Sequence, residues 1–180
     1  IYSKGQPFWQ ILTKNKTPAY IYFCPNTFPA QPLLGKMLSG MGVPDLYGTM
    51  GRLSFYTSRK LSKEEKETRG KIIFVESKNG IIETAIFGPK VELKGSIEES
   101  KVPLRIKIFP DKEMIQLEFQ KTVFLLIKET WGDWHKIYFR AGPFKKIYGI
   151  VRFYLKSIKP DFELYLGPIN FDPQRPLFPI

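Results

Sequence analysis

Hydrophobic and polar residues alternate along most of the chain after residue 51, which is the pattern of β-strands with one buried face. Short turn-rich segments separate the runs, a spacing typical of a β-sandwich or a partly open barrel of about eight strands. The runs are RLSFYT (52–57), KIIFVES (71–77), IIETAIF (81–87), LRIKIF (104–109), EMIQLEF (113–119), TVFLLIKE (122–129), WHKIYFRA (134–141), KIYGIVRFYLKS (146–157) and FELYLG (162–167).

Three of the separating segments predict hairpins, and a fourth predicts a turn. Asn79-Gly80 between two β-rich runs is the strongest short-range hairpin signal and should form a tight turn. Pro110-Asp111-Lys112 and residues 130–133 predict the other two hairpins, and the segment around Pro160 predicts a turn. The hairpins imply that 52–167 is one predominantly antiparallel unit.

The first fifty residues do not show this alternating pattern. Residues 7–16 place Phe8, Trp9, Ile11 and Leu12 on one helical face, between Pro7 and Pro18. The run AYIYFC that follows is apolar on both faces, as in a central strand of an α/β core that is covered on both sides. In a remnant of such a core, one side of this strand is expected to be exposed or covered by a neighbouring chain.

Two irregular segments follow. Residues 35–51, GKMLSGMGVPDLYGTMG, hold five glycines and predict a long structured loop. The charged segment LSKEEKETRG contains Ser62 and Glu65 at capping-box spacing, which predicts one short helix without an apolar stripe to anchor it.

The predicted fold class is therefore α+β and mainly β. Residues 1–51 would be a fragment of an α/β core with a glycine-rich loop, 52–167 an antiparallel β domain, and 168–180 an extended, proline-rich connector back to the core. Ile1 in place of Met and the apolar end Phe178-Pro179-Ile180 predict that both ends continue into a larger protein.

Composition and charge limit the function classes. The chain has 180 residues, of which 43% are hydrophobic and 15% aromatic, so it can bury a core and is not a disordered segment. The net charge is +11, but the lysines mostly alternate with apolar residues, as on the solvated face of a sheet. Attraction to a phosphate-bearing substrate or to anionic lipid headgroups stays open. The one cysteine, Cys24, allows no internal disulfide.

The inventory of reactive side chains predicts no catalytic residue and no metal site. His135 is the only histidine, while zinc sites need three or four ligands and nucleophilic catalysis needs a histidine beside its nucleophile. His135 is expected on the exposed side of a strand. Asp161, Glu163 and Asp172 are expected to be surface carboxylates.

The 35–51 loop and the residue after it offer the candidates for ligand binding, namely Lys36, Asp45, Thr49 and Arg52. The loop lacks the spacing of a P-loop. The less specific interpretation, a packing loop whose glycines serve turns, is favoured over direct contact with a ligand.

Aromatic and basic residues gather near the end of the β-rich region. Single-strand binding proteins mix stacking rings and cations in this way, but the core and rim of a β-sandwich give the same pattern more often. The residues are Trp131, Trp134, Tyr138, Phe139, Phe144, Tyr148, Phe153 and Tyr154, beside Lys136, Arg140, Lys145 and Lys146.

Four phrases resemble a subgroup of the alkaline phosphatase superfamily, the bacterial type I phosphodiesterase/nucleotide pyrophosphatase-like proteins. They are KGQPFWQIL (4–12), FCPNTFPAQP (23–32), GKMLSGMGVPDLYGTMGRLSFYT (35–57) and LGPINFDPQRPLFPI (166–180). Between residues 58 and 160 only a β-rich insert of suitable length matches. The resemblance implies a hydrolase of phosphate esters built on an α/β core, with a Thr or Ser nucleophile and two divalent metal ions, zinc or manganese. None of the family's ligand motifs falls inside this chain.

The leading expectation is an accessory β domain of a metal-dependent phosphoesterase that is inactive by itself and has the rest of the phosphatase-like core as its partner. A phosphate-bearing small molecule and a homo-oligomer are compatible with the sequence, and nucleic acid is disfavoured. The alternative is a stand-alone β-sandwich module that binds carbohydrate, lipid, protein or nucleic acid. The compartment, cytoplasmic or extracytoplasmic, stays open.

Overall fold

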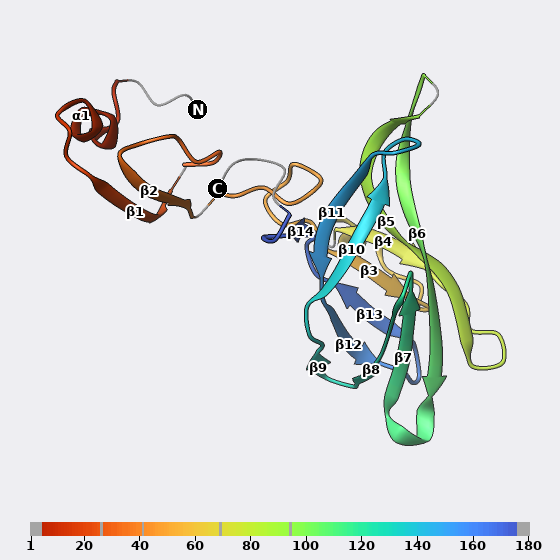
Figure 1. Ribbon diagram of the computed structural model, residues 1–180. Coiled ribbons are helices and arrows are strands. Elements are labelled where there is room, and N and C mark those ends of the chain that lie inside the picture. The colour runs from red at the N-terminus through yellow and green to blue at the C-terminus, as the bar shows by residue number, and fades with distance from the viewer. Residues whose placement is uncertain (1–4, 26, 41, 69, 94, 176–180) are drawn as a thin grey trace. The chain divides into compact units, whose positions relative to one another are not determined.

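The computed structural model describes residues 5–25, 27–40, 42–68, 70–93 and 95–175. These residues divide into two compact units, residues 5–43 and residues 44–175, which we term the N-terminal unit and the β unit (Figure 1). The contacts place residues 44–51, the second half of the predicted glycine-rich loop, with the β unit. Neither helix of the described residues is long and apolar enough to span a membrane.

The N-terminal unit contains helix α1 (Phe8–Lys14) and the parallel strands β1 (Ala19–Cys24) and β2 (Gly35–Ser39). Strand β2 corrects the prediction of a loop from residue 35 onward. A Cβ on Gly35 would lie 2.0 Å from the carbonyl oxygen of Ala19, and one on Gly40 would lie 2.2 Å from the Cα of Phe23. These glycines therefore let two backbones approach closely, a use of glycine that the sequence alone does not separate from a turn.

The β unit contains three sheets, and the prediction of a mainly β, largely antiparallel fold is confirmed. Among the described residues the sheets do not close into a barrel. The five-stranded sheet has the order β4-β3-β13-β12-β9, the four-stranded sheet β5-β6-β7-β8, and the three-stranded sheet β10-β11-β14. The strands are β3 (Ser54–Thr57), β4 (Lys71–Phe74), β5 (Ile81–Leu93), β6 (Ser96–Phe109), β7 (Met114–Phe119), β8 (Thr122–Ile127), β9 (Thr130–Trp131), β10 (His135–Arg140), β11 (Lys146–Val151), β12 (Phe153–Ser157), β13 (Glu163–Leu166) and β14 (Asn170–Phe171).

One continuous hydrophobic core joins the inward faces of these sheets. Large aromatic side chains from three sheets lie in it, including Tyr56 of β3, Phe119 of β7, Phe139 of β10 and Phe153 of β12. The hydroxyl of Tyr56 donates to the carbonyl oxygen of Ala85 at 2.9 Å and so ties the five-stranded sheet to β5. The alternation read from the sequence is therefore real, since one face of each long strand is buried.

The turn at Asn79-Gly80 is confirmed, but the hairpin around it is wrong. Asn79 and Gly80 both have positive φ, 52° and 77°, and Lys78 and Ile81 exchange two backbone hydrogen bonds. This is the geometry of a two-residue hairpin turn. The flanking strands then separate, because β4 pairs with β3 in one sheet and β5 pairs with β6 in another. The turn is a corner at which the chain changes sheets.

Of the other two predicted hairpins, one is confirmed and one is wrong. β6 and β7 pair around the 3-10 helix η1 (Pro110–Lys112), as expected. β12 and β13 also pair on either side of the predicted turn around Pro160. Residues 130–133 do not join a hairpin, because β8 pairs with β7 and β10 with β11. The apolar run 146–157 is also divided at Arg152, between strands of two different sheets.

Helix α2 (Lys63–Thr68) crosses between the parallel strands β3 and β4 and begins with the predicted capping box. Glu65 N donates to the Ser62 hydroxyl at 3.2 Å, and Ser62 N donates to the Glu65 carboxylate at 3.0 Å. The two side chains thus satisfy backbone groups reciprocally at the helix start.

Candidate functional site

Three of the four candidate ligand-binding residues lie in one loop of the β unit, and Asp45 organises that loop. Asp45 is buried, and its carboxylate accepts from Tyr47 N and Thr49 N at 2.9 Å. It also accepts from the Thr49 hydroxyl at 2.6 Å and from Arg52 N at 2.8 Å. A carboxylate has about four acceptor positions, so these four donors occupy Asp45 fully.

Tyr47 fixes the same loop to the four-stranded sheet. Its hydroxyl donates to the carbonyl oxygen of Phe87 at 2.5 Å. Burial, followed by the nearby charge of Glu99, raises the pKa of Tyr47 to about 12, so this hydroxyl stays a donor at neutral pH. The Arg52 side chain remains exposed and is the one cation of this loop that faces solvent.

The fourth candidate, Lys36, belongs to the N-terminal unit. It is exposed on β2 and lines a cavity of about 620 Å³ together with Tyr22, Gln31 and Met37. Gln31 accepts hydrogen bonds from Trp9 Nε1 at 3.0 Å and from Gln10 at 3.1 Å. The described lining of this cavity thus combines one cation, Lys36, with apolar side chains and the amide of Gln31.

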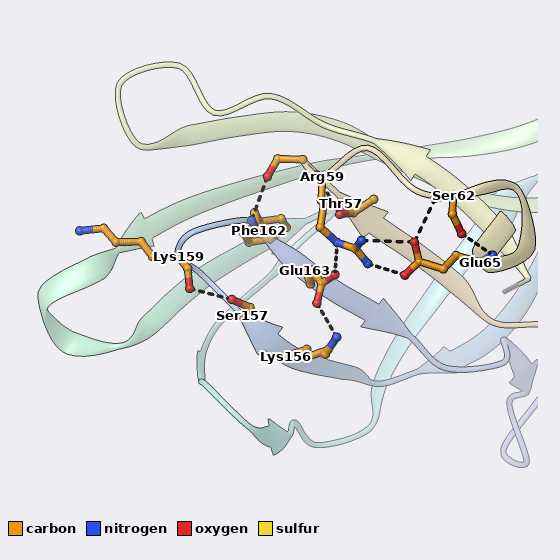
Figure 2. A network of polar contacts seen from close by, with 10 residues as sticks. Thr57, Arg59, Ser62, Glu65, Lys156, Ser157, Lys159, Phe162 and Glu163 are labelled. Atoms are coloured by element: carbon orange, nitrogen blue, oxygen red, sulfur yellow. Dashed lines mark hydrogen bonds and ion pairs between the residues drawn. The ribbon is translucent and has the colours of Figure 1, made fainter.

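A network of charged side chains that the sequence did not reveal lies at one end of the five-stranded sheet (Figure 2). Glu163 accepts from Arg59 Nε at 3.3 Å and from Lys156 Nζ at 2.6 Å. Arg59 also binds both oxygens of Glu65, at 2.7 and 3.2 Å. The hydrogen bond to Glu65 is the first cause of a raised Arg59 pKa, so the guanidinium stays charged.

This network corrects the prediction that Glu163 is a surface carboxylate. Its side chain is only 7% exposed, and Asp172, expected to be equally exposed, is buried as well. Both Glu163 oxygens are bound by cations, and Figure 2 shows Arg59 and Lys156 approaching them from different strands or loops. Each Glu163 oxygen is thus paired with a cation, which favours a structural role for this carboxylate.

His135 is the second correction, because it faces the core side of β10 and not solvent. Its ring stacks on Phe124 with centroids 3.9 Å apart, and Phe119 meets it edge to face. Nε2 is buried without a hydrogen-bond partner among the described residues. Burial lowers the pKa of His135, against the opposing charge of Asp133. The half-buried imidazole thus packs here as an aromatic ring at the edge of the core.

The structure also separates the aromatic and basic cluster into groups. Phe139 and Phe153 are core residues, while Trp131 and Trp134 are exposed. The Arg152 guanidinium lies between these two indoles, 4.4 and 4.9 Å from their ring centroids.

Tyr138 and Tyr148 form a second group on the outer face of the three-stranded sheet, with ring centroids 6.2 Å apart. Lys146 lies over the first ring and Arg175 over the second.

An open groove of about 770 Å³ runs between β6 and β10. Residues 98–103 form one wall, and Tyr138 and Arg140 form the other. At its end the Gln120 side chain donates to the Tyr138 carbonyl at 2.6 Å and accepts from Tyr138 N at 3.3 Å. Gln120 thereby occupies the hydrogen-bonding edge of β10, which would otherwise be open to another strand.

No group of three or more His, Cys, Asp or Glu side chains that could hold a metal ion occurs in the part of the chain that the structure describes. No family model matches this chain, and no curated protein or solved structure is significantly similar to it. The resemblance to the alkaline phosphatase superfamily therefore stays a prediction from the sequence phrases.

Proposed function

We propose that this chain is an accessory, non-catalytic β domain of a larger metal-dependent phosphoesterase, joined to a part of that enzyme's α/β core. In this proposal the N-terminal unit belongs to the core, and the β unit shapes the substrate side of the site. The nucleophile and the ligands of two divalent metal ions, zinc or manganese, would lie outside these 180 residues.

The observation that carries the proposal is the exposure of aromatic side chains on the described strands of the N-terminal unit. Parallel strands occur almost only in α/β proteins where both faces are covered, and two strands by themselves are marginally stable. Here β1 and β2 form a parallel pair, yet Tyr20, Tyr22 and Phe23 are 60%, 59% and 69% exposed. Helix α1 buries none of its residues. Further strands and helices of an α/β core would cover these aromatic side chains.

Charge gives weaker support. The chain carries a net charge of +11, and two of the candidate ligand-binding residues, Lys36 and Arg52, present exposed cations. Cations near a site raise the local concentration of a phosphate-bearing substrate and speed its association.

The test compares two proteins, the product of the complete reading frame of the gene and the 180-residue chain. The complete product should bind about two metal ions per molecule and hydrolyse a nitrophenyl phosphodiester with added zinc or manganese. The 180-residue chain should do neither. A reading frame that encodes only this chain, or a complete product without turnover, would refute the proposal. So would stoichiometric metal in the chain alone with turnover that a His135→Gln change abolishes.

A stand-alone binding module is the second candidate, and the groove between β6 and β10 is the observation that favours it. The groove carries both signs of charge, with Glu98 and Glu99 near Lys101 and Arg140, and the β unit has its own core. A module of this kind would be encoded without a phosphatase core and would bind its ligand alone. The comparison of reading frames therefore separates the two functions.

A further inference from the structure

The hairpin between β10 and β11 ends in a loop that exposes one phenylalanine completely. Ala141 N donates to the carbonyl oxygen of Lys145 at 2.8 Å and closes the loop around Gly142, whose φ is 136°. The Phe144 side chain at the tip is 101% exposed, the highest value among the large apolar side chains that the structure describes. Single exposed apolar side chains are common, so this exposure needs a second observation before it indicates a binding site.

The second observation is the charge around the tip. Arg140 and Lys146 are paired across the hairpin, and Lys145 follows Phe144 directly; all three are exposed. None of the three forms an ion pair with another described residue. The surrounding sequence, residues 134–160, holds seven basic residues and no acidic residue. The apolar tip is thus flanked by three cations that form no ion pair with a described residue, and Glu98 and Glu99 line the groove that Arg140 also lines.

We propose that this tip binds the surface of an anionic phospholipid membrane. Phe144 would enter the boundary between headgroups and acyl chains, and Arg140, Lys145 and Lys146 would contact the negative headgroups. Membrane-surface segments combine these two features, because an apolar side chain gains from leaving water while basic side chains gain from the surface potential. The proposal does not depend on the phosphoesterase function.

The geometry favours a lipid surface over single-stranded nucleic acid. Nucleic-acid binding of that kind uses ring faces along a groove, on which successive bases stack. The two tyrosine rings nearest the tip are already covered, since Lys146 Nζ lies 4.4 Å from the Tyr138 centroid and the Arg175 guanidinium 4.5 Å from that of Tyr148. Phe144 is a single ring on a protruding loop, which suits insertion and not stacking in series.

A neighbouring hairpin supplies a matched control. The β5–β6 hairpin reaches the same end of the β unit (Figure 1), and its Ile97 is 75% exposed. Glu92 is its cross-strand partner and Glu98 lies one residue away, so Ile97 is flanked by acidic residues where Phe144 is flanked by basic ones. The proposal therefore assigns membrane contact to Phe144 and not to Ile97.

The experiment measures sedimentation of the full chain with vesicles of phosphatidylcholine, with and without phosphatidylserine. The chain should bind the serine-containing vesicles, and raising the salt should weaken binding as the Debye length falls from about 10 Å at 0.1 M to about 3 Å at 1 M. Phe144→Ser should lower the affinity more than about ten-fold, since a buried phenylalanine is lost. Lys145→Gln with Lys146→Gln should lower it about 25-fold, at about five-fold for each cation.

Three variants serve as controls. Ile97→Ser and the distant pair Lys107→Gln with Lys112→Gln should bind close to the parent chain, and Phe144→Trp should retain binding because indoles favour the membrane interface. The urea midpoint of Phe144→Ser should equal that of the parent chain, since this side chain is fully exposed.

Four results would overturn the proposal. One is equal binding to vesicles with and without phosphatidylserine, and another is parental affinity in Phe144→Ser. The third is an equal loss of affinity in the two lysine pairs, which would show that only net charge matters. The fourth is a single-stranded oligonucleotide that displaces the chain from vesicles and binds Phe144→Ser as tightly as the parent chain.

Discussion

Changing Glu163 to glutamine tests whether the buried charge network stabilises the β unit. The substitution keeps the size and shape of the side chain and removes its negative charge. Its two partners lose a carboxylate at 3.3 Å from Arg59 Nε and 2.6 Å from Lys156 Nζ. The new amide could still accept through its one oxygen, but its nitrogen would face a cation.

The expected loss follows from the burial of the three side chains. Hydrogen bonds to charged groups contribute about 1.5–3 kcal/mol each when well shielded. Glu163 is 7% exposed, but Arg59 and Lys156 are 34% and 45% exposed, so water screens the cations and solvates them once the carboxylate is gone. Arg59 also keeps Glu65. We therefore expect a loss of about 2 kcal/mol in the free energy of unfolding, well below the sum of two shielded bonds.

Glu83→Gln is the matched control, because Glu83 forms a 3.2 Å ion pair with Arg105 on the exposed face of the four-stranded sheet. Exposed pairs contribute little, so its loss should stay near or below about 0.5 kcal/mol. Urea unfolding in a Trp9→Phe background reports on the β unit, since the remaining tryptophans, Trp131 and Trp134, both lie there. Equal losses in the two variants, or a Glu163→Gln effect that vanishes in high salt, would refute the reasoning.

Two further predictions concern the core of the β unit. Burial places the folded-state pKa of His135 below 6.5, so the unfolded chain binds this proton first as the pH falls. The free energy of unfolding should therefore fall as the pH drops through about 6.5 and level off below the folded-state pKa. His135→Phe should remove this fall, which urea midpoints compared at about pH 7.5 and about pH 5.5 would show. Gly88→Ala should cost about 1–3 kcal/mol, because its Cβ would lie 2.3 Å from the buried Phe139 ring and overpack the core. Gly167→Ala, whose Cβ would find no atom closer than 3.5 Å, is its control, and an equal loss there in urea unfolding would contradict the packing argument.

The sequence predicts where the strands lie better than it predicts how they pair. Local turn chemistry at Asn79-Gly80 reverses the chain, because both residues tolerate positive φ. It carries no information about how far the pairing continues beyond Lys78 and Ile81. β4 pairs with β3 and β5 with β6, and both strands contribute apolar residues that contact the common core, so the choice of sheet depends on long-range packing.

The same limit explains the divided run at 146–157. Its apolar residues alternate without interruption, so nothing local marks Arg152 as the point where the chain leaves one sheet for another. At the glycines of residues 35–40 the error is different, because a strand was predicted as a loop. Gly35 and Gly40 read as loop residues, whereas their lack of a side chain lets β2 lie beside β1.

The polar side chains divide in the same way between local and distant partners. The Asp45 loop has a local signature, an aspartate followed within four residues by Gly48 and Thr49, and its hydrogen bonds stay within seven residues. Glu163 and Arg59 are separated by 104 residues, so no window of sequence brings them together. Phe139, Phe144 and Phe153 likewise formed one aromatic cluster in the sequence, but two are buried in the core and one is fully exposed. In the proposed membrane contact, exposure therefore selects Phe144 as the residue of this cluster whose replacement should alter vesicle binding without altering the fold.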